Sequence, residues 1–148
     1  MSAREPDTFS GQDASVGWTV VRLAHVLSRR FEEEMRPFGL TPAQFGVLAT
    51  VAAEPGIGSG QLARRVLVTP QSVGELVAAL EAAGYLVRDR SGGRGRRAGI
   101  DLTPDGRTVL ANASRAAATL DDPAALGLTA AESQALNALL HRALRAQA

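Results

Sequence analysis

The sequence contains no cysteine and no lysine, so all sixteen of its basic residues are arginines. Without cysteine it can form no disulfide bond and carries no thiol switch. The two histidines, His25 and His141, are too few for a zinc site. No apolar run approaches the ~20 residues that cross a membrane, and residues 1–15 lack the apolar core of a secretory signal. We therefore expect a cytoplasmic protein that makes no contact with a membrane.

Sequence motifs of common catalytic sites are also missing. The chain has no H-E-x-x-H, no G-x-S-x-G and no phosphate-binding G-x-x-x-x-G-K-[ST]. The acidic run 32–34 lies one helical turn from Arg29 and Arg30, a pattern typical of a solvated, salt-bridged helix face. We expect no enzymatic activity, no cofactor and no metal.

Charge is balanced overall but unevenly distributed. The formal net charge is only +1, so total charge does not indicate a nucleic-acid partner. Residues 61–100 hold seven arginines and three acidic residues, whereas residues 1–15 sum to −2. A chain of 148 residues suits one domain with a modest core. We expect a disordered acidic tail over 1–15 and a single domain over 16–148.

The middle of the chain carries the pattern of a winged helix-turn-helix. Thr41 and Gln44 form a capping box at the start of one helix, and Thr69 precedes Pro70 at the start of another. Between them, Ser59 can cap a short helix over 61–66. Gly84 ends the helix from Pro70, and residues 85–87 and 99–102 then read as paired strands. This order predicts two helices joined by a tight turn, followed by a β-hairpin wing.

The loop between the predicted strands is strongly basic. Residues 88–97 contain five arginines and one aspartate, a net +4. Burying that density of charge would carry a heavy desolvation cost, so the loop must be solvated. After a helix-turn-helix pattern, a cationic loop favours contact with phosphates and a narrow minor groove. The alternative is a mobile hairpin that charge merely keeps soluble.

Long amphipathic helices flank this lobe. The first, 16–35, ends before Pro37, and its apolar residues recur at helical spacing: Val20, Leu23, Leu27, Phe31 and Met35. A helix from Thr103 to about Thr119 precedes a break at 121–128. The last helix begins at a capping box of Thr129 and Glu132, and its stripe comprises Leu136, Leu139, Leu140, Ala143 and Leu144. The lobe cannot cover both stripes, which favours a symmetric homodimer over a monomer with an internal helical cap.

In this order the elements resemble the MarR family of bacterial transcription regulators. The resemblance rests on LTPAQFGVLATVA (40–52), the run over 62–88 and DLTPDGRTVL (101–110), and covers about 16–146. It implies a mainly α fold with a small β-hairpin wing, in which a winged helix-turn-helix lobe (38–104) is flanked by dimerisation helices (16–37 and 105–148). It further implies a homodimer on a pseudo-palindromic double-stranded DNA operator. A small molecule often tunes binding from a pocket between the two parts.

The DNA contacts are expected from the outward face of the second helix, from the short helix before it and from the wing. These candidates are Ser59, Arg64, Arg65, Thr69, Gln71, Ser72, Glu75, Arg88, Arg90, Arg94, Arg96 and Arg97. Gln71 can read adenine through two hydrogen bonds, and Ser72 can hold a phosphate or a base edge. Glu75 departs from the family, which often has an arginine or another polar donor near that register. It can accept from the N4 amino group of cytosine, hold Arg64, Arg65 or a wing arginine in place, or remain a solvated carboxylate.

The wing departs from the family as well. The resemblance leads one to expect an aspartate that braces the arginine at the tip, and residues 93–97 contain none. Asp89 can take that role from the strand. The family's minor-groove arginine corresponds to Arg94 or Arg96, and the two remain alternatives.

Effector binding has one candidate cluster. Trp18, Arg22 and His25 share a face of the first helix and can meet an aromatic carboxylate or a phenol. The alternative is that Trp18 packs in the dimer and the other two line its wet margin. We therefore expect a DNA-binding repressor relieved by an aromatic or antibiotic-like ligand. A repressor without a ligand, or a winged-helix module that binds protein rather than DNA, remains an alternative.

Overall fold

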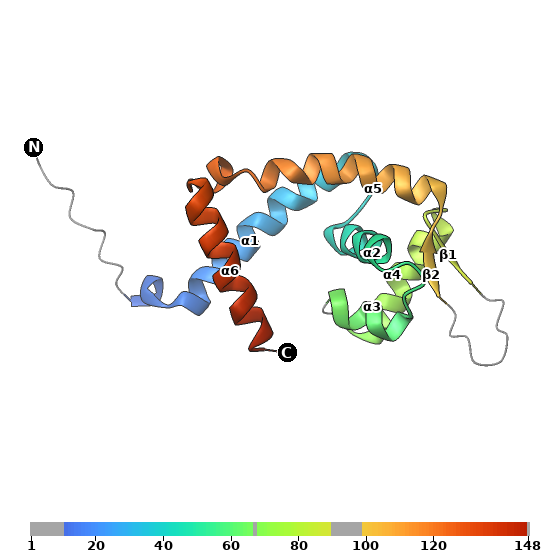
Figure 1. The fold of residues 1–148 in the computed structure, drawn as a ribbon, viewed down its shortest axis with the longest axis horizontal. Coiled ribbons are helices and arrows are strands. Elements are labelled where there is room, and N and C mark those ends of the chain that lie inside the picture. Colours follow the sequence, from blue (N-terminus) through green and yellow to red (C-terminus); the bar gives the residue numbers. More distant parts are fainter. Residues whose placement is uncertain (1–10, 67, 90–98, 148) are drawn as a thin grey trace, which may run out of the picture.

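The computed structural model describes residues 11–66, 68–89 and 99–147, and its elements are mainly helical (Figure 1). The helices are α1 (Val16–Met35), α2 (Pro42–Ala53), α3 (Ser59–Val66), α4 (Pro70–Ala82), α5 (Pro104–Ala117) and α6 (Ala130–Arg145). Strands β1 (Leu86–Arg88) and β2 (Ile100–Leu102) form an antiparallel hairpin. Short 3₁₀ turns lie at Gly11–Ala14, Arg36–Phe38, Ala118–Leu120 and Pro123–Leu126. The predicted class, a helical fold with one hairpin, is confirmed.

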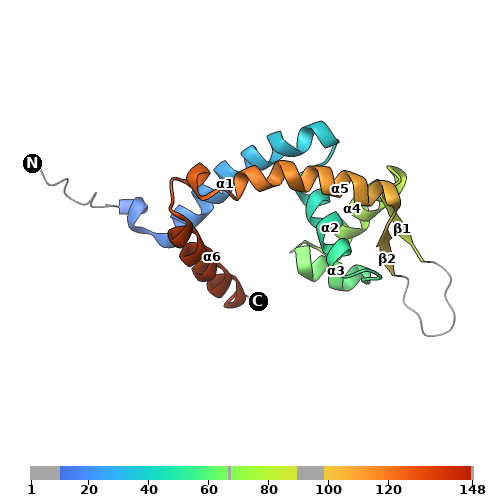
Figure 2. The same cartoon turned by 45° about the horizontal axis from the view of Figure 1, so that its top comes forward.

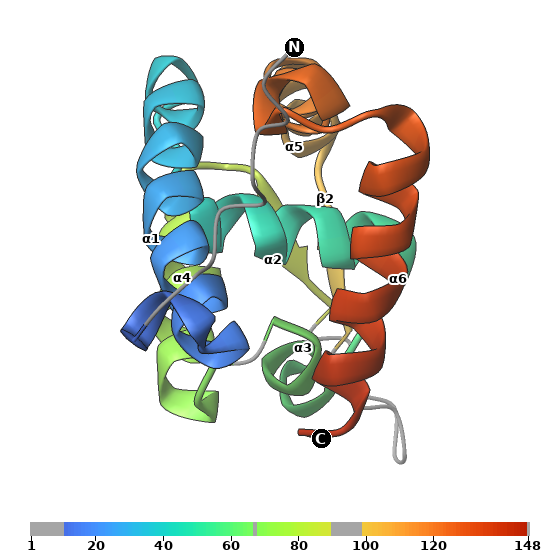
Figure 3. The same cartoon turned by 90° about the vertical axis from the view of Figure 1, so that its left-hand side faces the viewer.

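The elements form two parts. Helices α2, α3 and α4 gather with the hairpin into one lobe, while α1 and α5 pack together and extend away from it (Figures 1 and 2). Helix α6 turns back beyond the end of α5; it crosses α1 in the view of Figure 1 and stands apart from α1, on the other side of the molecule, in Figure 3. No helix in the described residues is long and apolar enough to span a bilayer.

Side-chain caps set most helix starts, as the sequence predicted. In both capping boxes the threonine hydroxyl accepts from a backbone N–H 3.2 Å away, and Gln44 and Glu132 accept from the backbone N–H of Thr41 and Thr129. The backbone and hydroxyl of Thr129 lower the pKa of Glu132. The predicted cap at Ser59 is wrong, because α3 already begins at that residue.

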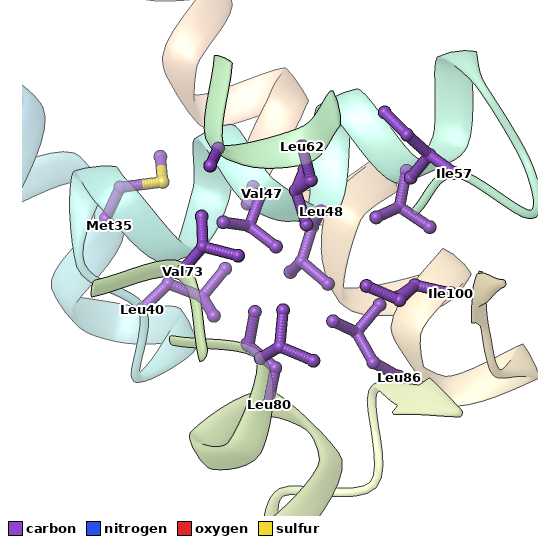
Figure 4. Packing of buried hydrophobic residues seen from close by; sticks show 14 of the residues in the cluster. Met35, Leu40, Val47, Leu48, Ile57, Leu62, Val73, Leu80, Leu86 and Ile100 are labelled. Carbon is purple, nitrogen blue, oxygen red and sulfur yellow. The ribbon is translucent and has the colours of Figure 1, made fainter. Parts of the chain in front are cut away.

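A compact apolar core holds the lobe together. Its buried side chains come from the end of α1, from α2, α3 and α4, and from both strands (Figure 4): Met35, Val47, Leu48, Val51, Leu62, Val73, Val77, Leu80, Leu86 and Ile100. Fully burying a side chain of this size stabilises the fold by about 1.5–3 kcal/mol. This core fixes α3 and α4 relative to each other.

The hairpin is anchored to the lobe at its base. Leu86 pairs with Leu102, Val87 with Asp101 and Arg88 with Ile100. The first strand begins one residue later than predicted, because the backbone N–H of Tyr85 donates a hydrogen bond to the carbonyl oxygen of Leu80 at the end of α4 (2.9 Å). Gly84, at φ +81°, makes that turn possible in the left-handed region. Ile100 also exchanges hydrogen bonds with the α2–α3 loop, which ties the wing to the helix-turn-helix.

Candidate nucleic-acid interface

Helix α4 has one buried face and one exposed face, as its periodicity predicted. Val73 and Val77 are 0% exposed, whereas Gln71, Glu75 and Ala78 are exposed on the opposite side. A helix in this position offers its outward side chains to whatever lies against the lobe. The exposed face contains no arginine, so its polar groups are suited to reading hydrogen bonds rather than to holding phosphates.

Two of the predicted DNA contacts, Thr69 and Ser72, take part in the N-terminal cap of α4. The hydroxyl of Thr69 accepts from the backbone N–H of Ser72 at 3.2 Å and donates to the Ser72 hydroxyl at 3.0 Å. Ser72 is half-buried, and its hydroxyl keeps a donor for a further partner. The cap therefore fixes the direction of both side chains at the end of α4 nearest to the turn.

The two arginines of α3 differ in their surroundings. Both are exposed, but Arg65 forms an ion pair with Glu54 at 2.5 Å, across the turn between α2 and α3. Within the described residues Arg64 forms no ion pair, and neither does Glu75. Glu75 therefore holds neither Arg64 nor Arg65, and the carboxylate beside Arg65 is that of Glu54; the alternative of a wing arginine at 90–97 lies outside the described residues. Arg64 is thus an exposed cation of the lobe with no compensating carboxylate among the described residues.

Arg88 lies at the base of the wing and is only partly exposed. Its Nε is 3.3 Å from a carboxylate oxygen of Glu81, an ion pair whose alignment is too poor for a hydrogen bond. The N–H of Asp89 donates to Gly99 across the hairpin (2.8 Å). Arg88 thus ties the first strand to the end of α4, a structural role that the sequence did not reveal.

Of the remaining predicted contacts, the structure describes only Ser59. Ser59 is exposed at the first position of α3, where it can face a ligand of the lobe. The wing residues Arg90, Arg94, Arg96 and Arg97 lie outside the described residues. The structure therefore places α3, α4 and the base of the wing on one lobe, while the role of the wing tip stays a sequence prediction.

A large apolar groove separates α1 from α6. Its volume is about 780 Å³, and Thr19 is the single polar residue in its lining: Ala14, Val16, Thr19, Val20, Leu23, Ala24, Leu27, Leu136, Leu139, Leu140 and Ala143. No residue of α6 is buried, and Leu139 is 52% exposed. Most of both predicted apolar stripes face this groove, whereas Met35 is buried in the lobe core, and the described residues of the single chain leave the groove uncovered.

A second cavity, of about 440 Å³, lies between α1 and α2, where the two parts of the molecule meet. Its walls are Ala24, Leu27, Ser28, Phe31, Pro42, Phe45 and Gly46. The rings of Phe31 and Phe45 meet edge to face, with centroids 5.3 Å apart. The sequence showed both as apolar helix positions, but nothing in it indicated that they meet.

The predicted effector cluster does not line either space. Trp18, Arg22 and His25 lie on a different side of α1, and Trp18 is 44% exposed. Their shared helix face is as predicted. The cavity between α1 and α2 is lined by other residues, among them the rings of Phe31 and Phe45.

Known proteins share this arrangement. A family model described as MarR family matches residues 38–97. The chain is 31% identical to the HTH-type transcriptional repressor Rv2887 of Mycobacterium tuberculosis over 130 residues. This match covers 88% of this chain and 94% of that protein. The crystal structure of Rv2887 in complex with salicylic acid has a TM-score of 0.71 at 30% identity, over 87% of this chain and 96% of that one. The transcriptional repressor CouR, bound to a 23-mer DNA duplex, has a TM-score of 0.80 at 30% identity, over 88% and 92%. The chain belongs to the MarR family of transcription regulators.

Proposed function

We propose that this protein is a homodimeric, sequence-specific DNA-binding repressor that a small aromatic molecule releases from its operator. The observation that carries the proposal is the exposed face of α4, which the lobe core holds against α3 with its exposed Arg64, an arginine without an ion pair among the described residues. That geometry suits a helix set into a major groove with a cation near the phosphates. CouR, a repressor of the same fold, binds a DNA duplex. A regulator of this kind acts in the cytoplasm and needs no catalysis.

The groove between α1 and α6 supports the dimer. An apolar surface of this extent on a water-exposed face is typical of a protein–protein interface. A second copy can cover it through the same residues, since a two-fold interface is self-complementary. We therefore propose that residues 16–37 and 105–148 form the dimer and that residues 38–104 form each DNA-binding lobe.

The cavity between α1 and α2 supports the effector. Its apolar and aromatic walls suit one aromatic ring, and it lies between the dimer helices and the lobe. A ligand there can change the angle at which the two lobes present α4. Rv2887 binds salicylic acid, so salicylate is the first ligand to test here.

The test is release of DNA by ligand. A labelled duplex selected in vitro for binding is titrated with the protein and followed by anisotropy, with and without salicylate. Ligand-dependent loss of affinity, abolished by Phe45→Trp to fill the cavity, supports the proposal. Tight DNA binding that no aromatic acid alters means a repressor without an effector.

One alternative has an observation in its favour. The exposed face of α4 carries a carboxylate and no arginine, which also suits a winged-helix module that binds a basic protein surface. Absence of salt-dependent duplex binding would favour that module over a repressor.

A further inference from the structure

The outward face of α4 combines one carboxylate with small neighbours. Gln71 and Glu75 lie four residues apart and therefore on the same side of the helix. Gly74 and Ala78 flank Glu75, and a Cβ placed on Gly74 would meet nothing within 4 Å. Small residues on both sides allow the helix to approach base edges closely. Glu75 thus stands at the centre of the surface that would enter the groove.

Within the part of the chain that the structure describes, no intramolecular role explains this carboxylate. Glu75 is exposed and forms no ion pair within the described residues. The residues three and four positions away are Gln71, Ser72, Ala78 and Ala79, so no cation lies at salt-bridge spacing along α4. It is also the sixth residue of the helix, beyond the first turn where a negative charge gains from the helix dipole. Against DNA, an uncompensated carboxylate costs affinity through repulsion by phosphates.

We infer that Glu75 is a specificity-determining residue that selects cytosine in each operator half-site, an inference that rests on the proposed DNA-binding function. In the major groove cytosine offers an N4 amino donor, which a carboxylate accepts. Guanine and thymine present only acceptors there, so Glu75 repels both. Adenine offers its amino group beside the N7 acceptor and is the weaker partner of a carboxylate. The residue therefore lowers affinity for DNA in general and raises the ratio between correct and incorrect sites.

The test compares base preferences of variants of the full-length protein. Operators are selected in vitro from a randomised duplex library at fixed salt with wild type, Glu75→Ala and Glu75→Gln. Glu33→Gln on α1 serves as control, because it makes the same charge change at an exposed site outside the lobe. Since both side chains are exposed, circular dichroism should show unchanged folding.

Wild type is expected to prefer cytosine at one symmetric position by at least about fivefold. Glu75→Ala is expected to lose that preference while keeping the others, and to bind an unrelated duplex more tightly than wild type. Glu75→Gln is expected to shift the preference toward adenine, the usual partner of glutamine. Selective binding with an unchanged base preference in Glu75→Ala would overturn this inference alone. Failure of wild type to bind any duplex would overturn the proposed function and this inference together.

Discussion

The two arginines of α3 should contribute differently to DNA affinity, because one is paired and the other is not. Arg64 is exposed and forms no ion pair within the described residues, whereas Arg65 lies 2.5 Å from Glu54. Each phosphate that a protein neutralises adds about 0.9 to the slope of log affinity against log salt. In a dimer, Arg64→Ala removes two such charges and should flatten the slope by about 1.8.

That change is large enough to measure. Between 50 and 200 mM salt, a slope smaller by about 1.8 reduces the loss of affinity about tenfold. Arg65→Ala should flatten the slope less, because Glu54 already compensates that charge, and Glu54→Gln should steepen it by releasing Arg65. Surface pairs of this kind are worth only about 0–1 kcal/mol, so folding should be unaffected.

The assay is fluorescence anisotropy of a labelled operator over a salt series. Arg115→Ala is the control, since it removes an exposed arginine from α5 near the end remote from the lobe. An effect of Arg65→Ala equal to or larger than that of Arg64→Ala would refute the reasoning. So would an equal effect of Arg115→Ala, which would mean that only total charge matters.

Three further variants test other parts of the account. Gly106→Ala places a Cβ 3.0 Å from the carbonyl carbon of Tyr85 and in steric clash with the carbonyl oxygen of Tyr85. That oxygen accepts a hydrogen bond from the backbone N–H of Thr103 across the base of the wing. We expect a loss of about 3 kcal/mol and a Tm lower by roughly 6–12 °C in thermal unfolding. Leu139→Glu puts a charge into the apolar groove and should give a monomer by light scattering at micromolar concentration. Arg94→Ala combined with Arg96→Ala should weaken binding to all DNA and flatten the salt slope by up to about two charges per subunit.

Matched variants sharpen these outcomes. Gly74→Ala adds a methyl group in open space within a helix and should stabilise by about 0.5–1 kcal/mol. Similar stability of the two glycine variants would contradict the close approach at Gly106. Ala138→Glu carries the same charge on α6 but lies outside the groove lining, so it should remain dimeric. An unchanged salt slope in the double arginine variant would show that the wing does not reach phosphate.

The sequence predicted the features that depend on neighbouring residues. Thr41, Thr69, Thr103 and Thr129 each cap a helix by bonding a backbone N–H within three residues, so the signal lies in four consecutive letters. Ser59 is not the cap because α3 begins at Ser59 itself, two residues before the predicted start at Gln61. The helical spacing of the apolar residues in α4 was enough to predict which of its faces is buried and which is exposed.

Features that join distant parts of the chain were not predictable in this way. The pair between Arg65 and Glu54 depends on how sharply the α2–α3 turn folds back. The contact of Phe31 with Phe45, and with it the cavity between α1 and α2, depends on the angle at which two helices pack. The sequence therefore predicted which helix faces are exposed, but not which charged side chains form ion pairs or where a cavity lies.

The most direct test of the account is titration of the purified protein onto a duplex from the intergenic region upstream of its own gene. An unrelated duplex is the control, and the salt concentration is varied from about 50 to 200 mM. We expect tight binding to the first duplex only, with an affinity that falls steeply as salt rises. No binding to either duplex at the lowest salt would contradict the central claim that this lobe is a DNA-binding surface.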